Sequence, residues 1–280
     1  MNLSEARQSF FKQLEKNYSK DELNTLFNII CKKTFDLDRV AIALNPEKKL
    51  NNTHQNEFKN IIKALKVFKP IQYIYGIADF YNLEFKVSPE VLIPRPETEE
   101  LVDIIVKDNL KRTPKILDIG TGSGCIAVSI AKNIPNSKVS AIDISNKALA
   151  IAQENANKNA VTIDFIENNI LNADNLFSTY DIIVSNPPYV RALEKEEMQP
   201  NVLEYEPSLA LFVTDNNPLI FYKKIAELSF KHLTPNGKLY FEVNRYLGIE
   251  IRDMVQSTGF SDVKLLKDFK GNDRFIIASI

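Results

Sequence analysis

Three of the eight glycines in this 280-residue chain lie within five residues, at Gly120, Gly122 and Gly124. They follow an apolar segment, residues 115–119, that predicts a buried strand, and they precede a segment at helical spacing. Glycine lets a backbone turn tightly and lets a ligand approach main-chain atoms, so this strand–loop–helix unit predicts a ligand-binding turn. The dinucleotide fingerprint is not met because Cys125 occupies the position of its third glycine, and no Gly-Lys-Ser/Thr follows as in a P-loop.

Beyond the glycine loop, segments typical of buried strands alternate with segments at helical spacing, such as 148–155 and 218–232. This alternation predicts an α/β fold in which a mostly parallel sheet carries helices on both faces. The predicted strands cover residues 115–119, 139–144, 162–166, 180–185, 239–243 and 274–280.

The first 70 residues are predicted to be helical and contain no cluster of catalytic side chains. Ser19 and Glu22 match a capping box and precede apolar residues at helical spacing. Two short strands are expected around Tyr81-Asn82, then a stiff loop at Pro94-Arg95-Pro96 and a helix from Glu99. The predicted organisation is a helical domain over residues 1–70, a hairpin and proline–arginine loop over 71–98, and an α/β domain over 99–280.

Composition indicates a globular protein that is held together by its core. Apolar residues make up 44% and charged residues 25%, which excludes a disordered or collagen-like chain. The longest apolar runs fall far short of the roughly 20 residues that a membrane span needs. The first ten residues lack the apolar segment and the cleavage site of a secretory signal peptide. Cys31 and Cys125 form no disulfide framework, and no Cys/His spacing resembles a zinc site. We therefore expect a cytoplasmic protein without a bound metal.

The charge balance does not indicate a nucleic-acid partner. The net charge is 35 − 36 = −1, of which residues 1–70 contribute 13 − 8 = +5 and the rest −6. Solvated helix faces account for this mild asymmetry better than a binding patch does.

Asp143 is the second candidate ligand-binding residue. It closes the second predicted strand, 23 residues after Gly120, where an acidic side chain can accept hydrogen bonds from both ribose hydroxyls of a nucleoside. The glycine loop has no basic residue for a phosphate, so a nucleoside with an uncharged linker fits better than a dinucleotide. S-adenosylmethionine is such a ligand. Asp118, just before the loop, is expected to orient loop amides or the amino group of the ligand.

A second motif, Asn186-Pro187-Pro188-Tyr189, follows the fourth predicted strand. Ligands of open parallel sheets collect outside the carboxyl ends of the strands, so this motif is expected to face the glycine loop. The Asn186 side-chain oxygen and the Pro187 carbonyl can accept the two hydrogens of a planar NH₂ group at about 3 Å. Tyr189 is expected to pack its ring on a flat amide or base.

These acceptors suit methyl transfer to an amide or aryl amine. The lone pair of such a nitrogen is delocalised, so fixing both N–H bonds aims it at a sulfonium methyl group. Accepting the hydrogens also stabilises the positive charge that develops on the nitrogen.

With these motifs the chain resembles the release factor glutamine methyltransferase family, PrmC (also called HemK). The resemblance covers most of the chain, and its most distinctive element is the proline–arginine loop. The matching segments are Pro70 to Gly76, Leu92 to Glu99, Asp118 to Cys125, Val184 to Tyr189, Tyr205-Glu206-Pro207, and Lys267-Asp268 with Arg274.

The resemblance implies a Rossmann-like, seven-stranded class I domain that uses S-adenosyl-L-methionine, behind a small helical substrate-recognition domain. It implies methylation of N5 of the glutamine in the Gly-Gly-Gln motif of peptide chain release factors, with S-adenosyl-L-homocysteine as the product. It implies that the protein binds neither a membrane nor, directly, a nucleic acid. The implied cofactor-binding residues are Gly120, Thr121, Gly122, Ser123, Gly124, Asp143, Asn169, Ile170 and Asn186. The implied substrate-binding residues are Asn186, Pro187, Pro188 and Tyr189, and of these Asn186, Pro187 and Tyr189 are the catalytic ones.

Three segments depart from the family pattern. Asn169 and Ile170 replace an Asp-Trp pair near the adenine; Asn169 keeps an acceptor oxygen, whereas Ile170 loses ring stacking. Residues 213–219 replace a Gly-Gly-x-Asp-Gly-Leu stretch, and 242–245 replace a Glu-x-Gly segment. None of them is expected to touch the amide-holding motif, so activity should survive more readily than cofactor affinity.

Three other functions remain open at this point. An adenine N6-methyltransferase shares Asn-Pro-Pro-Tyr but would need a basic nucleic-acid surface, and residues 71–280 carry −6. A glutamine methyltransferase acting on a ribosomal protein is closer. A cofactor-binding scaffold that does not methylate is disfavoured by the intact motif at Asn186.

Overall fold

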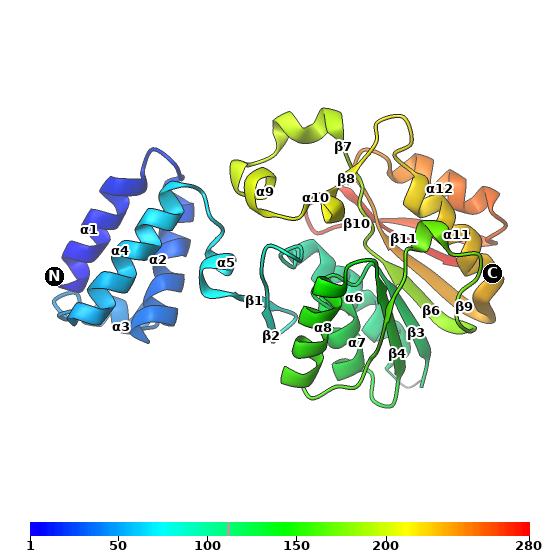
Figure 1. Cartoon of the computed structure of the whole chain (residues 1–280), viewed down its shortest axis with the longest axis horizontal. Coiled ribbons are helices and arrows are strands. Elements are labelled where there is room, and N and C mark those ends of the chain that lie inside the picture. The colour runs from blue at the N-terminus through cyan, green and yellow to red at the C-terminus, as the bar shows by residue number, and fades with distance from the viewer. Residues whose placement is uncertain (111–112) are drawn as a thin grey trace. The chain divides into compact units, whose positions relative to one another are not determined.

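The computed structural model describes residues 1–110 and 113–280, which form two compact units (Figure 1). The helical unit comprises Met1–Tyr75 and Pro200–Tyr205, and the α/β unit comprises Gly76–Gln199 and Glu206–Ile280.

In the helical unit, three longer helices enclose a core that is rich in aromatic rings. Phe10 lies 5.6 Å from Phe27 and 6.0 Å from Phe58, measured between ring centroids. The predicted capping box is present, because Ser19 and Glu22 each accept a hydrogen bond from the other's main-chain N–H. The helices are α1 (Leu3–Leu14), α2 (Lys20–Phe35), α3 (Arg39–Leu44), α4 (Asn52–Lys66), α5 (Ile71–Tyr75) and α9 (Pro200–Tyr205).

The α/β unit is built on the expected seven-stranded sheet, whose order is β10-β11-β9-β6-β3-β4-β5. Six strands point in the same direction, and only β11 runs antiparallel to its neighbours β9 and β10. The strands are β3 (Lys115–Ile119), β4 (Lys138–Asp143), β5 (Asp164–Glu167), β6 (Tyr180–Ser185), β9 (Leu233–Glu242), β10 (Asp262–Lys267) and β11 (Asp273–Ser279).

Two strands differ from the sequence-based expectation. β10 was not predicted, because it is an edge strand that alternates exposed charges such as Asp262 with half-buried residues. β9 begins at Leu233 and not at residue 239; its first half contains Pro235 and Asn236, which are typical of turns and hide the strand pattern.

Each strand sends alternate side chains to opposite faces of the sheet. Ile182 and Val184 pack toward one face, which is covered by α6 (Pro96–Asn109), α7 (Cys125–Asn133) and α8 (Asn146–Lys158). Ile183 packs toward the other face, under α11 (Ile220–His232) and α12 (Gly248–Ser257) (Figure 1). The sheet is therefore the middle layer of three.

Smaller elements surround this core. The expected hairpin consists of β1 (Ile77–Phe80) and β2 (Leu83–Lys86), and its turn residues Tyr81 and Asn82 have φ values of 46° and 58°. α6 begins at Pro96, earlier than expected, because proline suits the first helical position. The remaining elements are β7 (Val190–Arg191), β8 (Phe212–Val213), α10 (Ser208–Leu211) and the 3₁₀ turns η1 (Ile170–Asn172) and η2 (Ala192–Glu197). No helix within the described residues is both long and apolar enough to cross a bilayer.

Candidate active site

The glycine loop and the Asn-Pro-Pro-Tyr motif begin side by side. β3 and β6 pair in parallel, with Ile119 opposite Ser185 at their carboxyl ends. The strand order reverses between these two strands, and ligands bind at such a switch point in open α/β sheets. Both motifs line a cavity of about 430 Å³, here called the switch-point cavity. Its volume lies within the roughly 300–1,000 Å³ that is typical of small-ligand sites.

The glycine loop is held in a conformation that requires glycine. Gly120, Gly122 and Gly124 all have positive φ, at 76°, 54° and 79°. A Cβ on Gly124 would also lie 3.0 Å from the Cβ of Ala152 in α8, so the loop approaches that helix closely. Asn155 anchors the same loop, because its Nδ2 donates to the Ser123 carbonyl at 2.9 Å.

Asp143 ends β4 beside this loop and faces the switch-point cavity. Its Oδ2 accepts from the Gly122 N–H at 2.8 Å, and its Oδ1 accepts from the Ser145 N–H at 2.9 Å. Burial raises the pKa of Asp143, and the main-chain N–H groups of Ser145, Gly122 and Ile144 oppose that rise. A carboxylate offers about four acceptor positions, so each oxygen still has a lone pair for a ligand.

Asp118, the last acidic residue before the loop, is fully buried. Its Oδ2 accepts from the Thr121 hydroxyl at 2.6 Å, and thus it orients a loop side chain. Its Oδ1 has no hydrogen-bond partner among the described residues. Burial raises the pKa of Asp118 to about 7.

The segment after β5 contributes polar and apolar lining. Asn169 caps η1, because its Oδ1 accepts from the Leu171 N–H at 3.1 Å, and Ile170 is buried in the core beside the cavity. Asn168 also lines the cavity, and its side-chain oxygen is buried without a partner in the part of the chain that the structure describes. Sequence reasoning missed Asn168, since nothing in the pattern separates it from the adjacent asparagine.

Asn186 is connected by hydrogen bonds to two residues from other elements. Its Nδ2 donates to Thr98 Oγ1 at 3.4 Å, and the Thr98 hydroxyl donates to Glu242 Oε2 at 2.6 Å. Thr98 lies in the first turn of α6, and Glu242 is the last residue of β9. Sequence reasoning did not assign either residue to the site, because the two are 144 positions apart.

Tyr189 is oriented differently from the expectation. The tyrosine is not among the residues that line the cavity, and its ring packs against the core under α11. Its hydroxyl donates to Glu242 Oε1 at 3.3 Å, and its carbonyl accepts from Asn244 Nδ2 at 3.1 Å. The expectation that the divergent 242–245 segment would not touch the amide-holding motif is therefore wrong.

The carboxyl group of Glu242 is shielded from solvent, since only 1% of its surface is exposed. Burial raises its pKa, whereas the Thr98 hydrogen bond and the nearby Arg274 lower it. Burial and Glu242 together raise the pKa of Tyr189, so this phenol stays protonated. Arg274 is itself held by Asp268 Oδ2, at 3.2 Å from Nε.

The proline–arginine loop forms another part of the cavity wall. Arg95 pairs with Glu206 Oε1 at 2.6 Å, and the Ile93 N–H donates to Glu206 Oε2 at 3.1 Å. Glu206 is only 5% exposed, so the loop is tied to a buried carboxylate. Ile93, Pro94 and Arg95 all line the cavity.

The switch-point cavity thus collects most of the residues that the sequence singled out. Gly124 and Tyr189 do not line it. The residues that do are Gly120, Thr121, Gly122, Ser123, Asp143, Asn169, Ile170, Asn186, Pro187 and Pro188.

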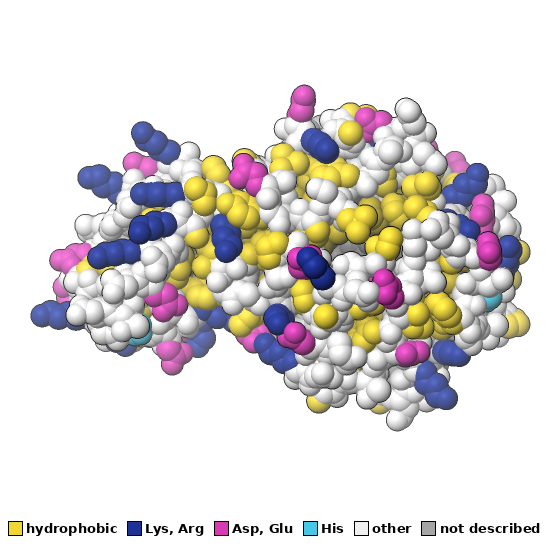
Figure 2. Space-filling model, viewed as in Figure 1, with side chains coloured by type: hydrophobic (Ala, Val, Ile, Leu, Met, Phe, Trp, Pro, Cys, Tyr) yellow, Lys and Arg dark blue, Asp and Glu magenta, His cyan; other side chains and the backbone are white. Residues whose placement is uncertain are grey.

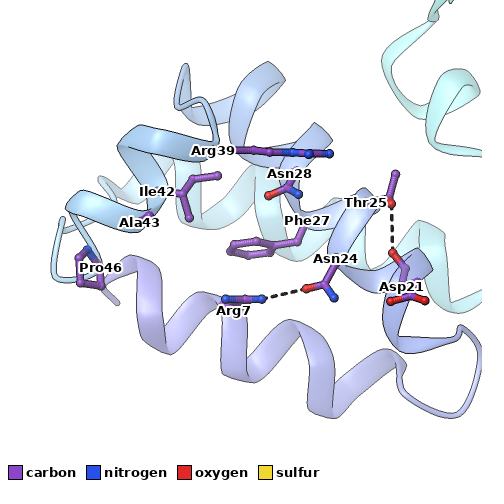
Figure 3. Close-up of a pocket in the computed structure, with 10 residues that line it drawn as sticks. All are labelled: Arg7, Asp21, Asn24, Thr25, Phe27, Asn28, Arg39, Ile42, Ala43 and Pro46. Atoms are coloured by element: carbon purple, nitrogen blue, oxygen red, sulfur yellow. Dashed lines mark hydrogen bonds between the residues drawn. The ribbon is translucent and has the colours of Figure 1, made fainter.

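A separate hollow of about 590 Å³ lies within the helical unit, here called the helical-unit pocket. Figure 3 shows Arg7 and Arg39 on either side of the Phe27 ring. Arg7 donates to Asn24 Oδ1 at 2.8 Å, and Asp21 is the acidic residue of the lining. On the face that Figure 2 draws, Lys and Arg side chains are spread over this unit.

Two family models match the chain. The PrmC N-terminal domain matches residues 5–76, and the Methyltransferase small domain matches residues 97–204.

Solved structures share the fold of the chain at low sequence identity. A methyltransferase from Pyrococcus furiosus has a TM-score of 0.52 at 21% identity and covers 82% of this chain and 100% of its own. The hMettl16 catalytic domain in complex with MAT2A 3'UTR hairpin 1 has a TM-score of 0.55 at 14% identity. That match covers 84% of this chain and 83% of the hMettl16 chain.

Curated relatives match over nearly the full length. A release factor glutamine methyltransferase of Flavobacterium psychrophilum is 52% identical over 274 residues, which are 96% of each chain. That of Bacteroides thetaiotaomicron is 47% identical over 269 residues, again 96% of each. These relatives do not favour a nucleic-acid or ribosomal-protein acceptor. The chain belongs to the release factor glutamine methyltransferase family.

Proposed function

We propose that this protein transfers a methyl group from S-adenosyl-L-methionine to the side-chain amide nitrogen, N5, of the glutamine in the Gly-Gly-Gln motif of peptide chain release factors. The observation that carries the proposal is the pairing of β3 with β6, which brings the glycine loop and Asn186 to one cavity. The relatives that are 52% and 47% identical to it over the aligned residues support the same acceptor. Because release factors act on ribosomes, we expect the protein to work in the cytoplasm.

The residues of the switch-point cavity fit S-adenosylmethionine. The glycine loop leaves open space at Gly120 and Gly122, where an added Cβ would meet nothing within 4 Å. Asp143 has acceptor positions for the ribose hydroxyls, and the Asn168 oxygen, which has no partner among the described residues, is available to accept from the adenine amino group. When bound, this cofactor supplies an electrophilic methyl group on a sulfonium. Asn169 and Ile170 are the further residues that we assign to its binding, with Thr121 and Ser123 in the loop.

Asn186 and Pro187 are proposed to hold the glutamine. The Asn186 Oδ1 atom and the Pro187 carbonyl each accept one N–H of the substrate amide, which fixes the plane of the NH₂ group. A fixed plane directs the nitrogen lone pair along one line and removes the orientational cost of the reaction. Both acceptors also stabilise the positive charge that grows on the nitrogen. Pro188 stiffens the turn that carries them.

We further propose that the helical domain recognises the release factor, with domains over residues 1–70, 71–98 and 99–280. The helical-unit pocket supports this role, because Arg7 and Arg39 offer guanidinium groups that suit an acidic side chain. In the double variant Arg7→Gln/Arg39→Gln, KM for intact release factor should rise about tenfold or more. Methylation of a short Gly-Gly-Gln peptide should not change. The control Lys59→Gln/Lys63→Gln removes two exposed charges of α4 that do not line the pocket.

The proposed reaction is tested by incubating the purified protein with S-adenosylmethionine and release factor, followed by peptide mass spectrometry. The expected result is one added methyl group on the glutamine of the Gly-Gly-Gln peptide. A release factor with alanine in place of this glutamine is the control. Methyl transfer to a ribosomal protein or to nucleic acid, with the release factor unmodified, would contradict the proposal.

A further inference from the structure

The side chain of Asn186 has two ends of opposite chemistry. Its oxygen accepts hydrogen bonds, whereas its NH₂ group donates them. Only the oxygen can hold the NH₂ group of a glutamine, because two NH₂ groups that face each other have no acceptor between them. The site therefore works only if the Asn186 amide is held in one of its two orientations.

Thr98 determines that orientation through the single hydrogen of its hydroxyl. The hydroxyl donates this hydrogen to Glu242 Oε2 at 2.6 Å, a short bond to a buried carboxylate. Toward Asn186 the Thr98 oxygen then presents lone pairs only, so the asparagine must turn its NH₂ group toward Thr98. This agrees with the contact of 3.4 Å between Asn186 Nδ2 and Thr98 Oγ1.

Glu242 provides the fixed acceptor for this series of hydrogen bonds. Its second oxygen accepts from the Tyr189 hydroxyl, three residues beyond Asn186 in the same motif. One carboxylate therefore contacts the motif both directly and through Thr98. Both oxygens of Glu242 thus act as acceptors, and both neighbouring hydroxyls direct their hydrogens toward it.

We propose that Thr98 and Glu242 are positioning residues for methyl transfer, which hold the Asn186 amide with its Oδ1 toward the substrate nitrogen. The inference rests on the proposed function and deepens it, because it names the residues that prepare the acceptor. Neither residue is assigned contact with the reacting atoms.

The test compares Thr98→Val, which keeps the shape and removes the hydroxyl, with Thr98→Ser, which restores the hydroxyl. For Thr98→Val, kcat on intact release factor should fall about 10- to 100-fold. KM for release factor and Kd for S-adenosylmethionine by calorimetry should stay within about threefold, because valine keeps the shape of Thr98 where it lines the cavity and the glycine loop is unchanged. Thr98→Ser should keep kcat within about threefold of the wild type.

Tyr222→Phe is the matched control. It removes a buried hydroxyl that donates to the main-chain carbonyl of Glu242 at 3.0 Å but does not touch the carboxylate. It should leave kcat within about threefold of the wild type, since the hydrogen bonds from Glu242 through Thr98 to Asn186 stay intact. An equal loss in Tyr222→Phe and Thr98→Val would mean that any missing hydroxyl beside Glu242 has this effect, and would overturn the proposal.

A spectroscopic readout separates this inference from the proposed function. With ¹⁵N-asparagine labelling, the side-chain NH₂ signals of Asn186 are assigned by their loss in Asn186→Asp. They should shift in Thr98→Val and keep their wild-type position in Thr98→Ser. Thr98→Ala takes the place of Thr98→Val if the valine variant does not bind cofactor.

The outcomes are distinct. If the wild type does not methylate release factor, the proposed function fails, and the NH₂ signals still decide the orientation. If the wild type is active but Thr98→Val keeps full kcat and unshifted signals, the positioning role is wrong. If kcat falls only because cofactor affinity falls, or if Thr98→Ser does not rescue, Thr98 supports the fold and does not position Asn186.

Discussion

The Ser185 hydroxyl donates a hydrogen bond of 2.7 Å to the Ile119 carbonyl, across the junction of β6 and β3. Both residues are buried, and each is the last residue of its strand. Gly120 follows one of them and Asn186 follows the other. This bond therefore joins the two strand ends from which the cofactor loop and the amide-holding motif extend.

Ser185→Ala should lower the free energy of unfolding by about 1–2 kcal/mol, because it leaves the buried Ile119 carbonyl without this donor. Chemical denaturation monitored by circular dichroism measures the change. Ser261→Ala is the comparison, since its hydroxyl also donates to a carbonyl, at 3.3 Å, but in an exposed position. A loss in Ser185→Ala no larger than in Ser261→Ala would show that the junction does not depend on this bond.

Asp143→Ala should weaken S-adenosylmethionine binding by about 1.5–3 kcal/mol, the scale of a lost charged acceptor. Two effects contribute, because the carboxylate is proposed to bind the ribose and it also accepts from the Gly122 N–H. Asp143→Asn keeps one acceptor oxygen and should lose less. Isothermal calorimetry measures both variants, and unchanged affinity in Asp143→Ala would refute the ribose role.

The position of the site could be predicted from the sequence because it depends on strand order and local motifs. A glycine loop after one buried strand and Asn-Pro-Pro-Tyr after another must lie at the carboxyl edge of a parallel sheet. The register of Ile119 opposite Ser185 agrees with that expectation. Most of the site residues that were predicted from the positions following each strand therefore line the cavity.

The residues that hold the Asn186 side chain in place could not be predicted in this way. Thr98 belongs to the first turn of α6 and Glu242 to the end of β9, and they meet only because the helix packs beside that strand. Nothing local marks either residue as a partner of Asn186. The contact of the Tyr189 hydroxyl with Glu242 could not be predicted for the same reason, since this buried acceptor comes from a distant strand.

Asp118 should make stability depend on pH. Burial raises its pKa in the folded protein from the ordinary value of 3.8 to about 7. The folded state therefore holds this proton more tightly than the unfolded state. The stabilisation is fully present below the unfolded pKa and is lost as pH rises toward 7. The free energy of unfolding should fall between about pH 4 and pH 7 more steeply in the wild type than in Asp118→Asn.

Denaturant unfolding at several pH values checks this expectation. The difference between the two proteins isolates Asp118, because Asp143 and Glu242 also have a raised pKa and remain in both. Parallel pH profiles in the wild type and Asp118→Asn would mean that this carboxyl does not titrate between folded and unfolded states.

Asn186 variants test the chemistry of the amide-holding motif most directly. Asn186→Ala removes the proposed acceptor and should lower turnover by about 10²–10³. Asn186→Asp keeps the shape and an acceptor oxygen, so it should retain measurable activity, although it can no longer donate to Thr98. Single-turnover methylation of a Gly-Gly-Gln release factor, with cofactor binding measured in parallel, separates chemistry from affinity. Near-wild-type turnover in Asn186→Ala would remove this asparagine from the reaction and, with it, the proposed way of holding the glutamine.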